Sequence, residues 1–84
     1  MPLFIDHHEK LPPMPAERAQ EVRHLLQSGE RDQNGTKGVN MYLSDDGQTW
    51  CLFDAPNADA VINAHRASGV PVEADDIVQV NSIL

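Results

Sequence analysis

Hydrophobic and polar residues alternate along four short segments of the chain, a pattern that is typical of half-buried β-strands. The segments comprise residues 2–8, 39–44, 48–55 and 76–83. The turn sequence Asp-Asp-Gly at positions 45–47 separates the second segment from the third. These two segments are therefore predicted to form a β-hairpin.

Two further segments repeat hydrophobic residues at the spacing of an amphipathic α-helix. Residues 16–28 form the first predicted helix and residues 58–68 the second. Asn57 can cap the start of the second helix, and Gly29 and Gly69 can end the two helices. The side chains expected to face the core are Ala19, Val22, Leu25 and Leu26 in the first helix and Ala58, Val61, Ile62 and His65 in the second.

The predicted elements follow one another in the order β-α-β-β-α-β. Right-handed crossovers then give an antiparallel four-stranded sheet with the spatial strand order 4-1-3-2 and both helices on one face. We therefore expect residues 1–84 to form a single α+β domain, a ferredoxin-like βαββαβ sandwich.

Alternation along the predicted strands assigns their side chains to the two faces of the sheet. The face expected to lie against the helices carries Leu3, Ile5, Val39, Met41, Leu43, Cys51, Phe53, Val78 and Val80. The opposite face carries Phe4, Asp6, His8, Asn40, Tyr42, Trp50, Asp54, Gln79 and Asn81. Large aromatic side chains on such a face usually mark an interface or a ligand cleft. We expect two sheets to face each other in a homodimer, with a dimer face or ligand cavity at Tyr42, Trp50, Asn40 and Gln79.

Charge and cysteine content narrow the classes of partner. The chain has 6 basic and 13 acidic residues, a formal net charge of −7. Nucleic acids and anionic membrane surfaces require lysine and arginine to meet their phosphates, so neither class of partner is expected. The single cysteine, Cys51, excludes a disulfide within the chain and is expected to be a small buried side chain. No apolar run approaches ~20 residues and no signal peptide is recognisable, so we expect a cytoplasmic protein.

Three histidines are expected to gather at one end of the domain. His7 and His8 end the first predicted strand, beside the start of the third, and His65 lies in the turn of the second helix that ends near the same edge. Imidazole nitrogen binds nickel, zinc, copper and iron. Asp6 is the better partner for His8, because residues two apart in a strand share a face and neighbours do not. The alternatives are a solvated strand end for the pair and, for His65, a core histidine bonded to a backbone carbonyl.

Motifs spread over nearly the whole chain are similar to those of one known family. They are Pro2-Leu3-Phe4-Ile5-Asp6-His7-His8, Trp50-Cys51-Leu52-Phe53-Asp54-Ala55-Pro56, Asp59-Ala60-Val61 with His65, Gly69-Val70-Pro71, Asp76-Ile77 and Val80. In these residues the chain resembles a family of small ferredoxin-like proteins, mostly without an assigned function, that includes a nickel-binding bacterial member. The resemblance implies a homodimer and nickel binding. The His7-His8 pair is the part most similar to the metal-binding member, and His65 matches the histidine of the family's second helix.

The sequence therefore supports a protein that binds a transition-metal ion, with nickel as the expected ion and sequestration, delivery or sensing as the role. The expected ligands are His8 and Asp6, followed by His7 and His65. An alternative is a dimeric small-molecule-binding protein or a cofactor-free oxygenase or isomerase. In that case a histidine would act as general base on a substrate held by Asn40, Tyr42, Trp50 and Gln79. An enzyme is less expected because no matched acid–base pair is present, and an adaptor with an acidic docking surface is a third hypothesis.

Overall fold

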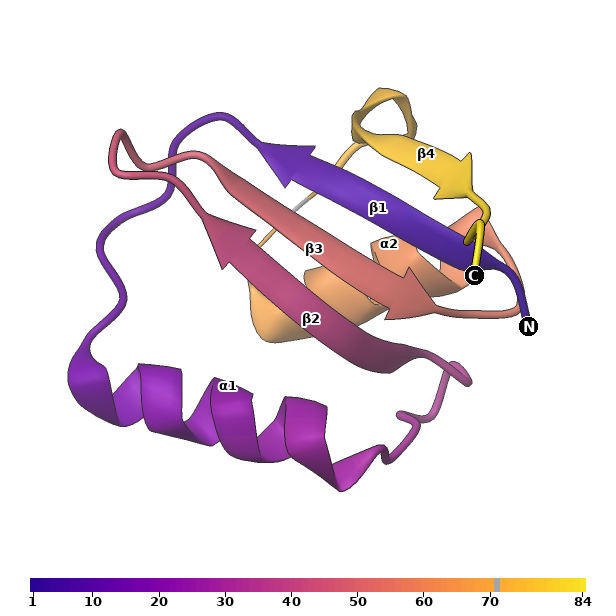
Figure 1. Cartoon of the computed structure of the whole chain (residues 1–84), viewed down its shortest axis with the longest axis horizontal. Helices are drawn as coiled ribbons and strands as arrows, with labels where there is room; N and C mark the ends of the chain where they lie inside the picture. Colours follow the sequence, from indigo (N-terminus) through magenta and orange to yellow (C-terminus); the bar gives the residue numbers. More distant parts are fainter. Residues whose placement is uncertain (71) are drawn as a thin grey trace.

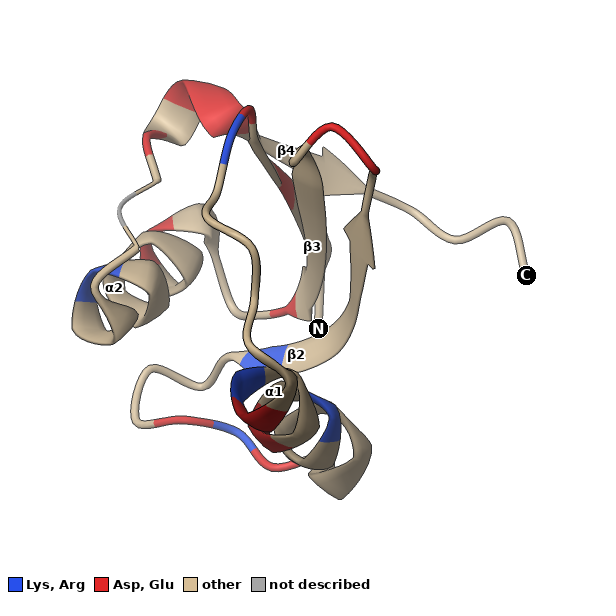
Figure 2. Cartoon of the chain, turned by 90° about the vertical axis from the view of Figure 1, so that its left-hand side faces the viewer, with Lys and Arg blue, Asp and Glu red and all other residues tan. Residues whose placement is uncertain are grey.

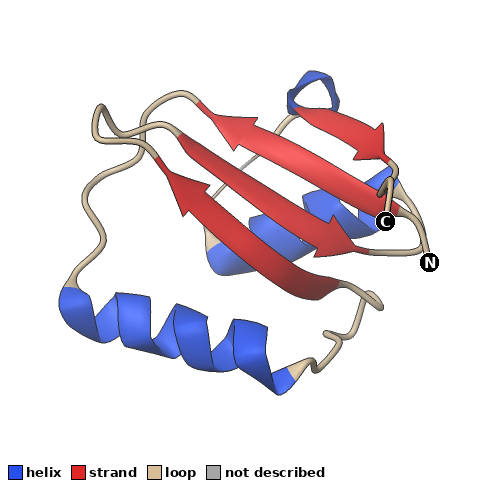
Figure 3. Ribbon diagram, viewed as in Figure 1, coloured by secondary structure: helices blue, strands red, loops and turns tan. Residues whose placement is uncertain are grey.

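Backbone hydrogen bonds join four strands into one antiparallel sheet, and one helix lies behind the sheet while the other lies along one of its edges (Figure 1, Figure 3). The computed structural model describes residues 1–70 and 72–84, so that Pro71, part of one motif above, lies outside the described residues. Its elements are β1 (Leu3–His8), α1 (Ala16–Ser28), β2 (Lys37–Leu43), β3 (Thr49–Asp54), α2 (Ala58–Ser68), the short 3₁₀ helix η1 (Ala74–Asp76) and β4 (Ile77–Val80). The strand order β2-β3-β1-β4 confirms the predicted ferredoxin-like α+β fold.

Both helices have the bounds that the sequence predicts, and local contacts explain where they begin and end. The Asn57 side chain accepts a 2.9 Å hydrogen bond from the backbone N–H of Ala60, which satisfies one of the free donors at the start of α2. Gly29 and Gly69 follow α1 and α2 with φ angles of 70° and 80°. Glycine adopts this left-handed conformation without steric cost. The predicted cap and both predicted helix ends are therefore confirmed.

All four strands differ in length from the predicted segments, and the differences are largest at the start of β2 and the end of β4, where neighbouring strands set the ends. β2 begins at Lys37, earlier than residue 39, because Lys37 already pairs with Asp54 at the end of β3. β4 ends at Val80, which pairs with the first residue of β1. Pairing with a neighbouring strand, and not alternation alone, therefore decides where each strand stops.

The hydrophobic core lies between α2 and the sheet. Its buried cluster and the partly exposed residues packed against it comprise Phe4, Ala55, Ala60 and Val61, with Phe53, Ala58 and Ile77. Ala58 and Val61 thus face the core as predicted. No helix within the described part of the chain is long and apolar enough to cross a membrane.

α1 packs less deeply than α2. None of its residues, all of which are described, is buried, and Leu25 is 61% exposed although the helical pattern predicts it in the core. Leu26 of α1 packs against β2 at Gly38. A Cβ atom at Gly38 would lie only 2.7 Å from Cδ2 of Leu26, which is too close for any residue except glycine unless Leu26 moves. Because glycine has no Cβ, it permits this close approach. α1 therefore lies along the β2 edge of the sheet and leaves room between itself and α2.

The register of the sheet reverses the predicted faces of β1. Directly opposed residues of an antiparallel pair share a face, and Asp6 lies opposite Cys51. Both residues are buried on the side that the helices cover. The other buried residues of β1 are Phe4 and His8. The prediction that Leu3 and Ile5 face the helices was therefore wrong, because polar side chains of β1 take the inner positions.

β4 is reversed in the same way. Gln79 lies opposite Phe4 and so on the helix-covered face, whereas Val78 lies opposite Ile5 on the open face. Three of the residues predicted to form a dimer face or ligand cavity share the open face: Asn40, Tyr42 and Trp50. The prediction that Gln79 joins them was wrong, because the register of β4 against β1 turns its side chain to the other side.

Candidate metal centre

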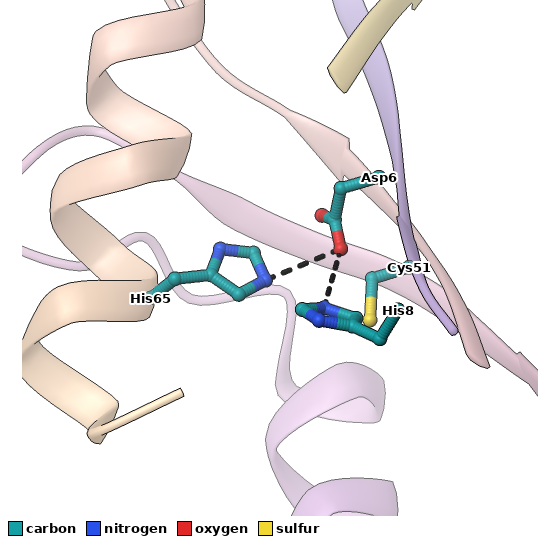
Figure 4. Close-up of side chains that lie close together, drawn as sticks. All are labelled: Asp6, His8, Cys51 and His65. Carbon is teal, nitrogen blue, oxygen red and sulfur yellow. Dashed lines mark ion pairs between the residues drawn. The ribbon is translucent and has the colours of Figure 1, made fainter. Parts of the chain in front are cut away.

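Four side chains that can bind a metal ion meet between α2 and the sheet (Figure 4). They are Asp6 and His8 from β1, Cys51 from β3 and His65 from the last turn of α2. One possible ligand atom of each residue lies within 4.8 Å of the others, and all four residues are buried. Asp6 and His8 share a face of the sheet because residues two apart in a strand point the same way. Strand pairing places Cys51 opposite Asp6.

The Asp6 carboxylate is the centre of this cluster. Its Oδ1 atom lies 2.8 Å from Nε2 of His8 and 3.3 Å from Nε2 of His65. Asp6 is 1% exposed, and its second oxygen, Oδ2, has no hydrogen-bond partner among the described residues. An ionised carboxylate is costly to bury unless it is paired. The arrangement therefore favours a positive charge beside Asp6, supplied by a proton on His65 or by a metal ion.

His65 is oriented by its own helix. Its Nδ1 lies 2.8 Å from the backbone carbonyl oxygen of Val61, which can only accept, so Nδ1 is assigned as the donor. Nε2 then directs a lone pair towards Asp6 unless it is protonated. Histidines that bind metals usually donate their other ring N–H to a carbonyl or carboxylate. The carbonyl-bonded histidine considered above is thus present, and the same bond prepares the ring for a metal ion.

Ring packing holds the two imidazoles in place. The ring centroids of His8 and His65 lie 5.3 Å apart, with the ring planes tilted by 38°. The His65 ring also meets Phe53 nearly edge-on, at 5.3 Å and 74°. These contacts restrict ring rotation and keep both Nε2 atoms directed towards Asp6.

The pKa of His65 lies above its ordinary value of 6.5. Burial lowers this pKa, but the hydrogen bonds to Asp6 and to the Val61 carbonyl, together with the charge of Asp6, outweigh burial. The folded chain therefore holds a proton on His65 more tightly than the unfolded chain does.

The metal-free protein is expected to lose stability as the pH rises through the pKa of folded His65. Because this pKa is raised on folding, its stabilising contribution is complete below about pH 6.5 and is lost above the folded value. Urea unfolding in EDTA between about pH 5.5 and pH 8.5 measures the free energy of unfolding across this window. His65→Gln should remove this part of the pH dependence, and an unchanged profile would contradict the assignment.

Cys51 joins the cluster as a neutral thiol. Burial, and after it the negative charge of Asp6, raises the pKa of this thiol to about 12. A bound cation would lower the pKa and allow sulfur to bind as the thiolate. The predicted burial of Cys51 is confirmed. Its place in the cluster was missed because only the register of β1 against β3 sets it opposite Asp6.

The structure does not bring His7 into the cluster. The His7 ring stacks on Trp50 on the open face, with centroids 5.0 Å apart and an angle of 25° between the planes. Its Nε2 atom lies 3.0 Å from Oε1 of Gln48. Neighbouring residues of a strand point to opposite faces, so only His8 of the histidine pair reaches Asp6.

A cleft of about 510 Å³ leads to the cluster. It lies between α1, α2 and the covered face of the sheet, and His8, Cys51 and His65 form part of its wall. Three of the four buried possible ligands, His8, Cys51 and His65, can therefore be reached from the cleft.

The fold and the cluster together define a class, that of small ferredoxin-like domains with a buried group of two imidazoles, a carboxylate and a thiol. Residues 4–80 match the family described as Nickel responsive protein SCO4226-like, and the chain belongs to this family. The match confirms the resemblance that the sequence motifs indicate. No curated protein and no solved structure matches the chain.

Proposed function

We propose that the protein binds a nickel ion through Asp6, His8 and His65, with Cys51 as a fourth donor. The observation that carries this proposal is the meeting of two imidazole Nε2 atoms at one buried carboxylate oxygen. Two further features support it. Oδ2 of Asp6 is unpartnered within the described chain, and the bond from His65 to Val61 leaves Nε2 available as a ligand.

The donor set suits a late first-row transition metal. Imidazole nitrogen binds nickel, copper and zinc, while a carboxylate and a thiolate complete a mixed set of nitrogen, oxygen and sulfur donors. The family description names nickel responsiveness, which favours nickel among these ions. We propose sequestration, delivery or sensing of nickel as the role.

Replacing His8 by glutamine should weaken nickel binding by at least about 100-fold, or about 2.7 kcal/mol, because one imidazole ligand is lost. His7→Gln should change the affinity by less than about twofold, since its ring lies on the other face of the sheet. Isothermal titration calorimetry of protein purified without a metal-affinity tag measures both dissociation constants. Because the two histidines are neighbours in β1, equal losses in both variants would indicate damage to the strand and remove the proposal. Unchanged affinity in His8→Gln would also remove it.

We also propose that two chains pair through the open face of the sheet. The apolar and aromatic side chains of this face are Leu3, Ile5, Tyr42, Trp50, Leu52, Val78 and Val80. Tyr42 is 49% exposed and Val78 is 57% exposed. An apolar patch of this kind usually marks a protein interface, and a second copy of the same face is complementary to it in character.

Leu52→Lys is expected to weaken this self-association by at least about 30-fold, because the substitution places an unpaired charge in the interface. Leu52 lies opposite Ile5, so it occupies a central strand pair of the open face. Leu25→Lys is the matched control, since Leu25 is exposed on α1 in the wall of the cleft and not on the open face of the sheet. Sedimentation equilibrium at several concentrations measures the mass. A wild-type protein that remains a monomer, or a Leu52→Lys variant that still dimerises fully, would contradict the pairing.

A further inference from the structure

The cleft between α1 and α2 is larger than a metal ion needs. Its volume is about 510 Å³, whereas one water molecule takes about 30 Å³ of liquid. Pockets of roughly 300–1,000 Å³ hold small organic molecules. The wall is mainly apolar and includes Leu11, Met14, Val22, Leu26, Phe53 and Val70. A hydrated ion gains nothing from such a wall, so the body of the cleft suits a hydrocarbon group.

One polar side chain of the wall, Thr36, is buried without a partner. Thr36 is 4% exposed, and its Oγ1 forms no hydrogen bond with any described residue. Its backbone is bonded to Asp32: the Thr36 N–H donates to Oδ1 of Asp32, and the Thr36 carbonyl accepts from the Asp32 N–H, both at 2.9 Å. A buried hydroxyl without a partner destabilises a fold. Its presence in the wall of a cleft therefore points to a bound group that completes the hydrogen bond.

The charged residues of the wall leave an excess of negative charge. Arg18 and Arg31 each form an ion pair with a carboxylate outside the wall, at 3.0 Å and 2.9 Å. The wall also contains Glu30 and Asp32, which form no ion pair with any residue that the structure describes. Figure 2 shows these acidic residues in the loop between α1 and β2, on either side of a basic one. Arg31 also donates a 2.9 Å hydrogen bond to the carbonyl of Gly35, beside Thr36, but its charge is paired with Asp54. The exposed carboxylates of Glu30 and Asp32 therefore leave this part of the cleft negative on balance.

We propose that the cleft is a binding site for a small organic cation with an apolar body, such as a primary alkylammonium ion. The N–H groups of the cation donate to Oγ1 of Thr36, beside the carboxylates of Glu30 and Asp32. Its hydrocarbon chain lies against the apolar wall, which includes Leu26 and Phe53. The hydroxyl without a partner among the described residues, the two carboxylates without an ion pair among them and the apolar volume thus each match one part of the same ligand.

The proposed site is separate from the candidate metal centre, although the two share one cleft. Thr36 precedes β2, and Met41 of β2 pairs with Cys51. At about 3.3 Å per residue along the strand, Thr36 lies on the order of 15 Å from the level of Cys51. The organic cation and a metal ion can therefore bind at the same time, and the proposal does not depend on nickel binding.

Titration of the full ¹⁵N-labelled chain with n-octylamine, which is protonated at neutral pH, tests the site by NMR. EDTA is present so that no metal contributes. Octylamine is expected to shift the amide signals of Leu26, Thr36 and Ala64 saturably. The shorter n-butylamine and the oppositely charged octanoate should bind at least about tenfold more weakly. Octanoate binding as tight as that of octylamine, or no saturable shift of these signals, would overturn the proposal.

Two substitutions separate ligand binding from folding. Thr36→Val removes the unpartnered hydroxyl at nearly constant volume, so the affinity for octylamine should fall at least about fivefold while Tm stays equal or rises. Ala64→Leu fills the cleft from α2 and should weaken binding by a similar factor, whereas Ala67→Leu, exposed on the same helix and outside the wall, should not. A Thr36→Val variant with lower Tm and unchanged affinity would assign the hydroxyl a purely structural role and overturn the proposal.

Discussion

Nickel at about 100 times its dissociation constant should raise the melting temperature of the protein by roughly 10–20 °C. A ligand that binds only the folded state stabilises it by about 2.7 kcal/mol at that excess. In a domain of this size, each kcal/mol shifts Tm by about 4–8 °C. Binding at the proposed site would be selective for the folded state because the four donors come from β1, β3 and α2, which only the fold brings together. Circular dichroism during heating, with and without nickel, measures the shift.

Matched variants show whether this stabilisation comes from the cluster. In His8→Gln/His65→Gln the rise should be less than about 3 °C, because both imidazole ligands are lost. In His24→Gln, a histidine exposed on α1, the full rise should remain. EDTA should reverse the effect, and magnesium, which prefers oxygen ligands, should not produce it. A full rise in the double variant would show that nickel stabilises the chain through other groups.

Phe4→Ala should lower the free energy of unfolding by about 3–5 kcal/mol, the usual cost of removing a buried aromatic ring. Phe4 belongs to the buried cluster between the sheet and α2. For a domain of this length the total stability is roughly 4–13 kcal/mol, so the variant would lose a large share of it. The neighbouring substitution Ile5→Ala should cost about 1–2 kcal/mol, because Ile5 lies half-buried on the open face.

Urea denaturation of both variants compares the two faces of β1 directly. The measurement is made at concentrations low enough to separate any dimer, so that the contribution of Ile5 to self-association does not enter. An equal cost for both substitutions, or a larger cost for Ile5→Ala, would contradict the burial of Phe4, Asp6 and His8 under the helices.

The elements and their order could be predicted from the sequence because each depends on local properties. Alternation of polar and apolar residues predicts a strand, Asn57 predicts the start of α2 and Gly69 predicts its end. None of these signals depends on the position of the rest of the chain. The faces of β1 could not be predicted in this way. One side carries Leu3 and Ile5 and the other only Phe4 beside Asp6 and His8, so hydrophobicity alone would turn Asp6 and His8 outward. The structure turns them inward, and a local rule of this kind is most often broken at a functional site.

Three of the four candidate metal ligands, Asp6, His8 and His65, were predicted from the sequence, and Cys51 was not. Asp6 and His8 are two residues apart in a strand, so alternation predicts that they share a face, and His65 was expected on the inward face of its helix. That Asp6 and His8 meet His65 was not predicted, because the faces of β1 are the reverse of those expected. Cys51 joins them only through the register of β3 against β1, which depends on the whole sheet. His7 lies away from them because adjacent strand residues alternate, a rule that already favoured His8 in the sequence.

More than half of the chain separates His8 from His65, yet their rings lie 5.3 Å apart. One ion bound to both imidazoles would cross-link the first strand to the second helix and close a loop that contains α1 and the β2–β3 hairpin. A disulfide bond persists in the unfolded chain, whereas this link exists only while the chain is folded, so it stabilises the fold by mass action and depends on the concentration of the ion and not on the redox state. The lifetime of the protein in the presence of proteases would then follow the supply of metal, with no change of fold.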